Sequence, residues 1–157
     1  MIQNVANLPD KVDLEADVCI IGSGAGGAVA AAVLAEAGRS VVVLEEGGYF
    51  TKEDFRNRDI LWAFEEMYRN AGSTGTVGMP PILMPIGKTV GGSTTVNSGT
   101  MFRTPDKVLK EWEWTYGVQD AGPEHMARYM DIVEETTEVM PVREEILGEN
   151  QKKIREG

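Results

Sequence analysis

Two short apolar runs flank an alanine-rich segment near the start of the chain. Val18–Ile21 and Val41–Leu44 are continuous apolar runs, a pattern typical of parallel strands that are buried on both faces. Between them, the segment from Gly26 to Gly38 is rich in alanine and carries larger apolar residues at helical spacing, and Gly38 is suited to end a helix. The pattern predicts an α/β fold built on a strand–helix–strand unit with a right-handed crossover.

Hydrophobic spacing predicts further helices downstream. Thr51, followed by acidic residues, has the features of a helix N-cap. Apolar residues at helical spacing follow it: Ile60, Leu61, Phe64, Met67, Tyr68 and Ala71. Another helix is expected to begin near Pro105, and one more to run from about Pro123 to Met140. Residues 143–157 are polar and only weakly helical in pattern.

Residues 72–100 differ in character from the helical segments around them. They are rich in glycine, proline, serine and threonine and have little periodicity, so we expect a long ordered loop. A loop of this length in a compact domain usually has a function. Residues 1–15 are expected to form an irregular polar lead-in, followed by one domain over residues 16–157.

Composition narrows the class of protein. The chain has 157 residues, of which 42% are hydrophobic and 25% charged, as in soluble globular proteins. The formal net charge of −10 argues against a nucleic-acid partner, which requires a concentrated basic face. The single cysteine, Cys19, excludes an intrachain disulfide and a cysteine-based zinc site, and we expect it to be a buried strand residue. No metal site is predicted.

The start of the chain lacks the features of a secretion signal. Residues 1–15 contain neither a basic segment nor an apolar core of the signal-peptide kind. The longest apolar stretch, around Ala28–Ala35, is too short to cross a bilayer. A soluble protein of the cytoplasm is therefore expected.

The first chemical motif lies directly after the first predicted strand. It has the pattern G-x-G-x-x-G and consists of Gly22-Ser23-Gly24-Ala25-Gly26-Gly27. In such a turn Gly22 allows the tight bend, Gly24 allows the backbone to approach a pyrophosphate, and Gly27 allows close packing of helix on strand. The helix that follows directs its free N–H groups and positive dipole end at the phosphates. All six residues are candidate ligands of a dinucleotide.

Glu45 strengthens this interpretation. It ends the second predicted strand, 18 residues after Gly27, where a carboxylate accepts hydrogen bonds from the ribose hydroxyls of a dinucleotide. A carboxylate there repels a 2′-phosphate, so NADP is disfavoured. The competing interpretation is a structural strand–helix–strand unit without a ligand. The preceding strand, the following helix and Glu45 together favour dinucleotide binding.

The end of the second strand bears on which dinucleotide is bound. Val43-Leu44-Glu45-Glu46-Gly47 resembles the hydrophobic–Glu–x–Gly ending of FAD-binding folds of the glutathione-reductase type. In NAD dehydrogenases the acidic residue is more often aspartate and lacks the following glycine. The resemblance implies FAD, and it adds Glu46 to the candidate ligands.

A second motif lies within the glycine-rich loop. The run Gly91-Gly92-Ser93-Thr94-Thr95-Val96-Asn97-Ser98-Gly99-Thr100 resembles the G-G-S-[ST]-x-x-N segment of the glucose–methanol–choline (GMC) oxidoreductase family. In that family the segment lies along the FAD pyrophosphate and flavin, where bulky side chains would block the approach. The resemblance implies that the loop contacts FAD. The implied ligands are Val90, Gly91, Gly92, Ser93, Asn97, Ser98 and Thr100.

The resemblance covers only part of the chain, and it is greatest to one group within the family. It covers residues 16–117 best, and the chain looks most similar to bacterial and plant long-chain alcohol oxidases and dehydrogenases. Some members carry a histidine bonded covalently to the flavin just before the asparagine of this segment. Val96 stands there in this chain, so we expect the FAD to be bound non-covalently.

GMC enzymes oxidise an alcohol by hydride transfer to flavin N5 while a histidine base takes the hydroxyl proton. That base lies in the C-terminal half of much longer proteins. The only histidine here, His125, is near the start of an amphipathic helix and is expected to be a surface residue, so no catalytic residue is predicted. We therefore expect the amino-terminal part of an incomplete FAD fold, with an alcohol as substrate and the missing half as a possible partner.

Two other functions stay open on the sequence alone. One is the FAD-binding part of another flavoprotein reductase, against which the Gly91–Asn97 segment argues. The other is a non-catalytic nucleotide- or partner-binding module, in which apolar surface left uncovered would serve as an interface.

Overall fold

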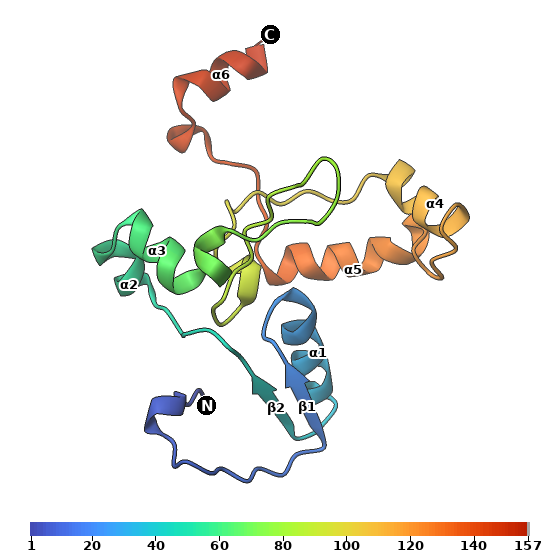
Figure 1. The fold of residues 1–157 in the computed structure, drawn as a ribbon. Coiled ribbons are helices and arrows are strands. Elements are labelled where there is room, and N and C mark those ends of the chain that lie inside the picture. The colour runs from blue at the N-terminus through green and yellow to red at the C-terminus, as the bar shows by residue number, and fades with distance from the viewer. Residues whose placement is uncertain (157) are drawn as a thin grey trace. The chain divides into compact units, whose positions relative to one another are not determined.

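The structure is a computed structural model and describes residues 1–156. Figure 1 follows the chain from its blue amino terminus to its red carboxyl end. The chain forms two compact units, Met1–Ser98 and Gly99–Gly157.

The first unit contains the predicted strand–helix–strand element. β1 (Val18–Ile21) and β2 (Val41–Leu44) pair in parallel, with Val18 opposite Val41 and Ile21 opposite Leu44. α1 (Ala25–Glu36) connects them and packs on both strands (Figure 1). The helix ends two residues before Gly38, whose φ of +81° suits the left-handed turn that leads into β2. The α/β prediction and both strand ranges are confirmed.

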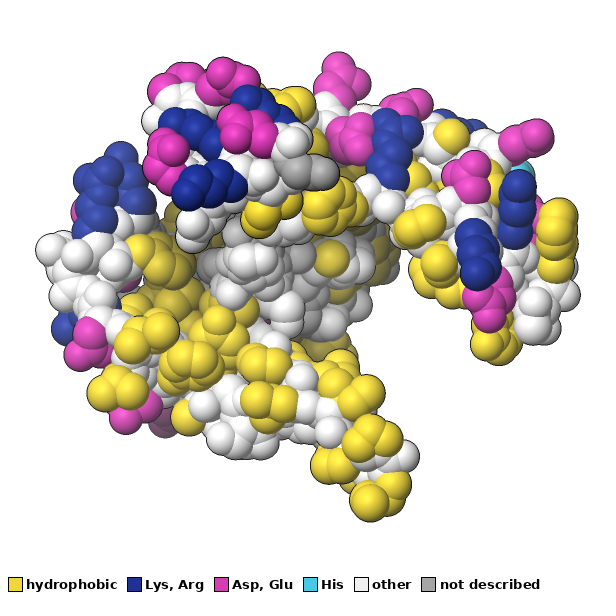
Figure 2. Space-filling view, turned by 90° about the horizontal axis from the view of Figure 1, so that it is seen from above, with side chains coloured by type: hydrophobic (Ala, Val, Ile, Leu, Met, Phe, Trp, Pro, Cys, Tyr) yellow, Lys and Arg dark blue, Asp and Glu magenta, His cyan; other side chains and the backbone are white. Residues whose placement is uncertain are grey.

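The two strands are more exposed than expected. Ile21 is 88% exposed, Leu44 is 53% exposed, and Cys19 is also exposed, so the prediction of strands buried on both faces is wrong. Parallel strands are buried on both faces only when other elements cover both. Among residues 1–156 this sheet has only two strands, and of the helices only α1 packs on it. Figure 2 shows how widely hydrophobic side chains reach the surface on one face of the molecule.

Two short helices follow β2. α2 (Lys52–Asn57) begins at the predicted cap, where Thr51 and Asp54 form a capping box. α3 (Ile60–Met67) starts afresh because the Asp59 carboxylate accepts a hydrogen bond from the Trp62 amide at 2.8 Å, which makes Asp59 a second N-cap.

The apolar face predicted after Thr51 extends beyond the observed helix. α3 ends at Met67, so Tyr68 and Ala71 lie outside it. Ala71 and its neighbour Asn70 have φ of 49° and 51°, a left-handed conformation that interrupts helical spacing. Met67 itself is 1% exposed and lies in the core of this unit.

Residues 72–100 form the ordered loop that the sequence predicts. Isolated bridges pair Gly75 with Leu83 and Tyr68 with Gly87, and a third joins Gly48, just beyond β2, to Thr89. Thr89 is fully buried, and its hydroxyl donates to the Gly48 carbonyl at 2.9 Å. These contacts return the loop to the end of β2.

The second unit is helical. It contains α4 (Asp106–Trp114), α5 (Pro123–Thr136) and α6 (Glu149–Glu156), with Leu109 and Ala121 buried in its core. The helices near Pro105 and from Pro123 are confirmed. α5 ends before the expected Met140, because the chain turns at Glu138, where φ is 53°.

Candidate cofactor-binding site

The glycine turn begins where β1 ends. Gly22 has a φ of +91°, and its amide donates to the Leu44 carbonyl of β2 at 2.7 Å. A Cβ atom on Gly27 would lie 2.0 Å from the Gly22 carbonyl oxygen and 3.3 Å from the Ile20 side chain. Helix α1 therefore approaches β1 so closely that only glycine fits at Gly27.

Gly24 and Gly26 are under no such constraint from the protein. A Cβ atom on either would meet no atom within 4 Å. Gly24 is the N-cap of α1 and has no side chain that could accept a hydrogen bond from the N–H groups of the first helical turn. Open space at the positive end of a helix dipole, beside two glycines, fits the pyrophosphate of a dinucleotide.

Glu45 is held against this turn by three hydrogen bonds. Its Oε2 accepts from the Ser23 amide at 2.8 Å and from the Ser23 hydroxyl at 2.7 Å. Its Oε1 accepts from the Gly47 amide at 3.0 Å. The carboxylate at the end of β2 therefore has a defined orientation next to the glycine turn.

The same contacts keep Glu45 ionised. Burial would raise the pKa of Glu45, but the hydrogen bonds from the Ser23 amide, the Ser23 hydroxyl and the Gly47 amide outweigh it, and the pKa is lower than usual. An ionised carboxylate is an acceptor only, which is what the hydroxyl groups of a ribose require. The geometry thus suits the predicted role of Glu45.

The second motif lies directly on the first. The Gly91 amide donates to the Ser23 hydroxyl at 2.9 Å, across 68 residues of sequence. A Cβ atom on Gly92 would lie 3.0 Å from the Gly24 Cα, so the two backbones approach too closely for an ordinary side chain contact at Gly92. Gly91 and Gly92 have φ of +91° and +57°, which glycine adopts without strain. Two motifs that are separate in sequence therefore form one site.

Glu46 points to a different partner from Glu45. Its carboxylate forms an ion pair and a hydrogen bond with the guanidinium of Arg69. This hydrogen bond is the main cause that raises the pKa of Arg69, followed by the charge of Glu46. A role of Glu46 as a cofactor ligand stays a prediction, and its observed contact ties the end of β2 to the segment after α3.

Other residues of the second motif make local contacts that shape the loop. Val90 donates its amide to the Gly48 carbonyl at 2.9 Å, Ser93 accepts from the Gly87 amide at 3.0 Å, and Asn97 donates to the Thr94 carbonyl. Their contacts to a cofactor stay predictions, as do those of Ser98 and of Thr100, which belongs to the second unit.

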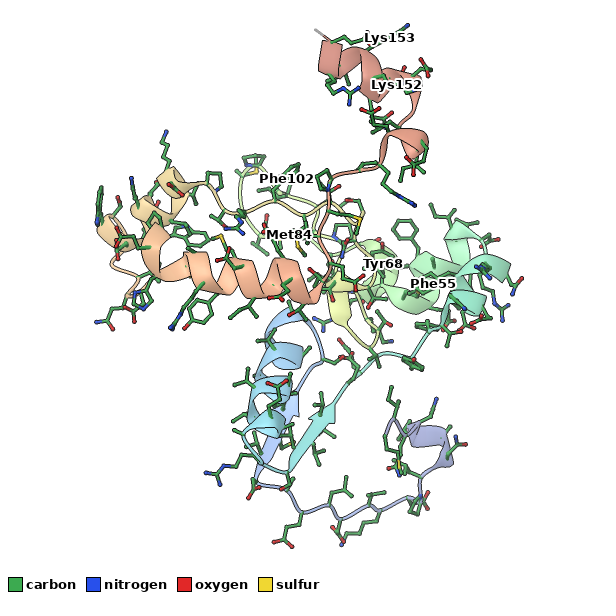
Figure 3. All side chains as sticks on the ribbon, turned by 180° about the vertical axis from the view of Figure 1, so that it is seen from behind. Phe55, Tyr68, Met84, Phe102, Lys152 and Lys153 are labelled. Carbon is green, nitrogen blue, oxygen red and sulfur yellow. The ribbon has the colours of Figure 1, made fainter. Side chains whose placement is uncertain are left out.

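Tyr68 anchors the end of the motif, a role that the sequence pattern did not indicate. Figure 3 labels this side chain, which follows α3. Its ring stacks on Phe64 with centroids 4.8 Å apart, and its hydroxyl donates to the Val96 carbonyl at 3.1 Å. Helical spacing assigns Tyr68 to the apolar face of a helix, so its contact with Val96 can be recognised only in the folded structure.

Gly47 also shapes the site, in a way that its place in the Glu–x–Gly ending did not by itself predict. A Cβ atom on Gly47 would lie 2.2 Å from the backbone of Lys88 and Thr89. The loop that carries the second motif therefore passes too close to the end of β2 for any side chain. The glycine in the Glu–x–Gly ending is the signal that marks this approach.

Three further features of the described part of the chain bear on other kinds of site. His125 is 52% exposed, and its Nε2 lies 3.6 Å from the Asp120 carboxylate in the second unit, in agreement with a surface residue. Residues 1–156 contain no group of three or more His, Cys, Asp or Glu side chains arranged to hold a metal. None of the helices described has both the length and the apolar composition to cross a membrane.

Comparison with known proteins identifies the family. Residues 64–157 match the sequence model of the GMC oxidoreductases, which is more than half of the chain. The chain belongs to the GMC oxidoreductase family. Residues 20–56 of this GMC protein also match an NAD(P)-binding Rossmann-like domain. Both the family and the Rossmann-like, dinucleotide-binding fold expected from the two motifs are confirmed.

Two individual relatives show how much of this GMC protein, and of each relative, the similarity covers. It is 45% identical over 135 residues to an uncharacterised GMC-type oxidoreductase of Mycobacterium tuberculosis, a match that covers 86% of this chain and 22% of the relative. It is 40% identical over 120 residues to a long-chain-alcohol oxidase of Arabidopsis thaliana, covering 76% of this chain and 16% of that protein. The chain thus spans about a fifth of the length of such relatives.

Proposed function

We propose that this GMC protein binds the ADP part of FAD without a covalent bond, and that the complete enzyme oxidises an alcohol. The observation that carries the proposal is the junction at Ser23. There the glycine turn, the ribose-binding carboxylate Glu45 and the amide of Gly91 meet through hydrogen bonds of 2.7–2.9 Å. A single elongated ligand that touches both motifs explains why they are joined.

The residues favour FAD over the nicotinamide dinucleotides. An ionised Glu45 suits unmodified ribose hydroxyls and repels the 2′-phosphate of NADP. The Glu–x–Gly ending and the second motif resemble FAD-binding segments. In the structure Gly47 lies against the backbone of Lys88 and Thr89, and Gly91 donates a hydrogen bond to Ser23 of the glycine turn. These features support FAD rather than NAD.

The alcohol as substrate is supported by the relatives. Several carry the name long-chain-alcohol oxidase, and the chain is 33–40% identical to such proteins or to a cholesterol oxidase. When bound, FAD supplies a flavin ring that accepts hydride from the alcohol carbon. The residues described here bind and orient the nucleotide end of the cofactor. We assign the catalytic base and the alcohol pocket to sequence that corresponds to the remaining length of the relatives.

That further sequence also explains the exposed sheet. Ile21 and Leu44 lie opposite each other in β1 and β2, and both are more than half exposed. Leaving such side chains in water forgoes about 25 cal/mol for each Å² of apolar surface that a covering element would bury. We infer that the catalytic half of the enzyme covers this face.

The test measures which dinucleotide the protein retains. The purified protein is incubated with FAD, NAD or NADP, and the affinity of each is measured by equilibrium titration. We expect FAD to bind most tightly. Retention of NAD in preference to FAD would contradict the choice of cofactor, and binding of none of them would favour a non-catalytic module.

Two adjacent glutamates provide a matched pair of variants. Glu45→Ala removes the proposed ribose ligand and should weaken FAD by about 1.5–3 kcal/mol, the usual range for a hydrogen bond to a charged group. Glu46→Ala removes the same charge from the next residue, whose carboxylate faces Arg69, and should change FAD affinity much less. Equal effects of the two variants would contradict the distinct role proposed for Glu45.

A further inference from the structure

The Ser23 side chain lies where the three parts of the site meet. Its Oγ is 2.7 Å from Glu45 Oε2 and 2.9 Å from the Gly91 amide nitrogen. Its own amide donates to the same Glu45 oxygen at 2.8 Å. Ser23 is the second residue of the glycine motif, where the sequence argument placed it among the direct ligands of the cofactor.

The hydrogen-bonding capacity of Ser23 excludes one such role. A serine hydroxyl has one proton to donate and two lone pairs that accept. The Gly91 N–H is a donor, so Ser23 Oγ accepts there and its single proton is directed at Glu45. The hydroxyl then has no proton left for a phosphate oxygen, which is itself an acceptor. In this arrangement the Ser23 side chain is not a phosphate ligand.

We propose instead that Ser23 is a positioning residue that couples the two motifs, orienting Glu45 for the ribose and holding Gly91 against the glycine turn. The coupling rests on the proposed function, because the ligand shared by the two motifs is the dinucleotide. Gly92 runs so close to Gly24 that a Cβ on it would lie 3.0 Å from the Gly24 Cα, so a shift of the neighbouring Gly91 alters the space that the pyrophosphate would enter. Loss of one hydroxyl therefore disturbs the carboxylate and the loop together.

The ionisation of Glu45 gives this role a distinct signature. Burial raises the pKa of Glu45 and the Ser23 and Gly47 hydrogen bonds lower it, so removal of the Ser23 hydroxyl moves the pKa upward. The charge of Arg69 also interacts with Glu45, and Arg69 is paired with Glu46, a pair that the substitution leaves unchanged. A pKa below the usual value keeps the carboxylate charged as the pH falls. Without the hydroxyl, Glu45 takes up a proton at a higher pH.

The test uses Ser23→Ala, with Ser40→Ala as control. The Ser40 hydroxyl, like that of Ser23, accepts from a backbone amide and donates to a carboxylate, both of them from Asp17 and neither from the cofactor site. In protein free of dinucleotide, the Glu45 carboxyl is titrated by carbon NMR and the exchange of the Gly91 amide is followed. In Ser23→Ala we expect a higher pKa for Glu45 and faster exchange at Gly91, and in Ser40→Ala neither change.

Binding is then measured as a function of pH. For Ser23→Ala we expect FAD affinity at neutral pH to fall about tenfold or more, as for the loss of a hydrogen bond to a charged group. The pH at which acid releases FAD should also rise, since that pH follows the protonation of Glu45. An unchanged Glu45 pKa together with an unchanged release pH would overturn the proposal, because a direct phosphate ligand lowers affinity without shifting either.

A second pair of variants covers the case in which Ser23→Ala does not fold. Ser23→Thr and Ser23→Val have the same shape and differ only in the hydroxyl, so any steric cost is shared. We expect a higher Glu45 pKa in the valine variant than in the threonine variant, and equal values would overturn the proposal. Both titrations are made without a dinucleotide. A protein that behaves as expected there but does not bind FAD would refute the proposed function and leave the Ser23 contacts in place.

Discussion

Gly24 and Gly27 are three residues apart in one motif, yet the structure assigns the need for glycine to different causes. At Gly27 the obstacle to a side chain is the protein itself, since an added Cβ would lie 2.0 Å from the Gly22 carbonyl oxygen. At Gly24 an added Cβ would meet nothing within 4 Å. Gly27→Ala should therefore damage the fold, and Gly24→Ala should damage only the binding of the cofactor.

The expected magnitudes follow from these distances. Ordinary contact begins at 3.4 Å and the added Cβ would lie 2.0 Å from the Gly22 carbonyl oxygen, so Gly27→Ala forces α1 away from that carbonyl by about 1.4 Å, an overpacking that costs about 1–3 kcal/mol. Because the obstacle is backbone, which does not move aside easily, we expect a cost in the upper part of this range. Alanine's higher helix propensity offsets about 0.8–1 kcal/mol of it, which leaves a net loss of about 1–2 kcal/mol in the free energy of unfolding. Gly24→Ala occupies an extended conformation with φ of −64°, and its stability should stay within about 0.5 kcal/mol of the original.

The assay combines urea unfolding of the dinucleotide-free protein with titration of FAD. Gly26→Ala is the control, because it adds the same atom inside α1 in open space and should raise stability by up to about 1 kcal/mol. Stability of Gly27→Ala equal to that of the original protein would refute the close packing of α1 on β1. A stable Gly24→Ala variant with undiminished FAD affinity would refute the placement of the pyrophosphate at this turn.

Three further outcomes are expected. Acid precipitation of the FAD-loaded protein should leave the flavin in the supernatant, because Val96 has no group that bonds to it, and yellow flavin in the pellet would contradict this. Thr89→Val should lower the free energy of unfolding by about 1 kcal/mol or somewhat more, measured by urea titration, because it removes a fully buried hydroxyl that donates to the Gly48 carbonyl. Hydrogen bonds from the Ser40 amide and hydroxyl lower the pKa of Asp17, so the stability that Asp17 contributes is present above the ordinary pKa and is lost as the pH falls through the lowered pKa. Asp17→Asn should therefore make the free energy of unfolding less dependent on pH in that acidic range, and an unchanged pH profile would contradict this.

The local elements and the chemistry they carry could be predicted from the sequence. The strand–helix–strand unit follows from two apolar runs and an alanine-rich helix, and the N-cap at Thr51 from one side chain and its neighbours. The roles of Gly22 and Gly27 could be predicted because a turn off a strand and the packing of the next helix depend on residues close in sequence. Motif spacing indicated the GMC family for the same reason, since each motif is continuous.

The way in which those parts meet is visible only in the folded chain. Ser23 lies 22 residues from Glu45 and 68 from Gly91, and no periodicity in the sequence predicts that one hydroxyl joins both. The sequence made both neighbours, Glu45 and Glu46, candidate ligands, whereas the fold directs one to the glycine turn and the other to Arg69. The exposure of the sheet was misjudged for a related reason. An apolar strand is suited to being covered on both faces. Whether it is buried depends on which elements pack on it, and those elements come from segments distant in the chain.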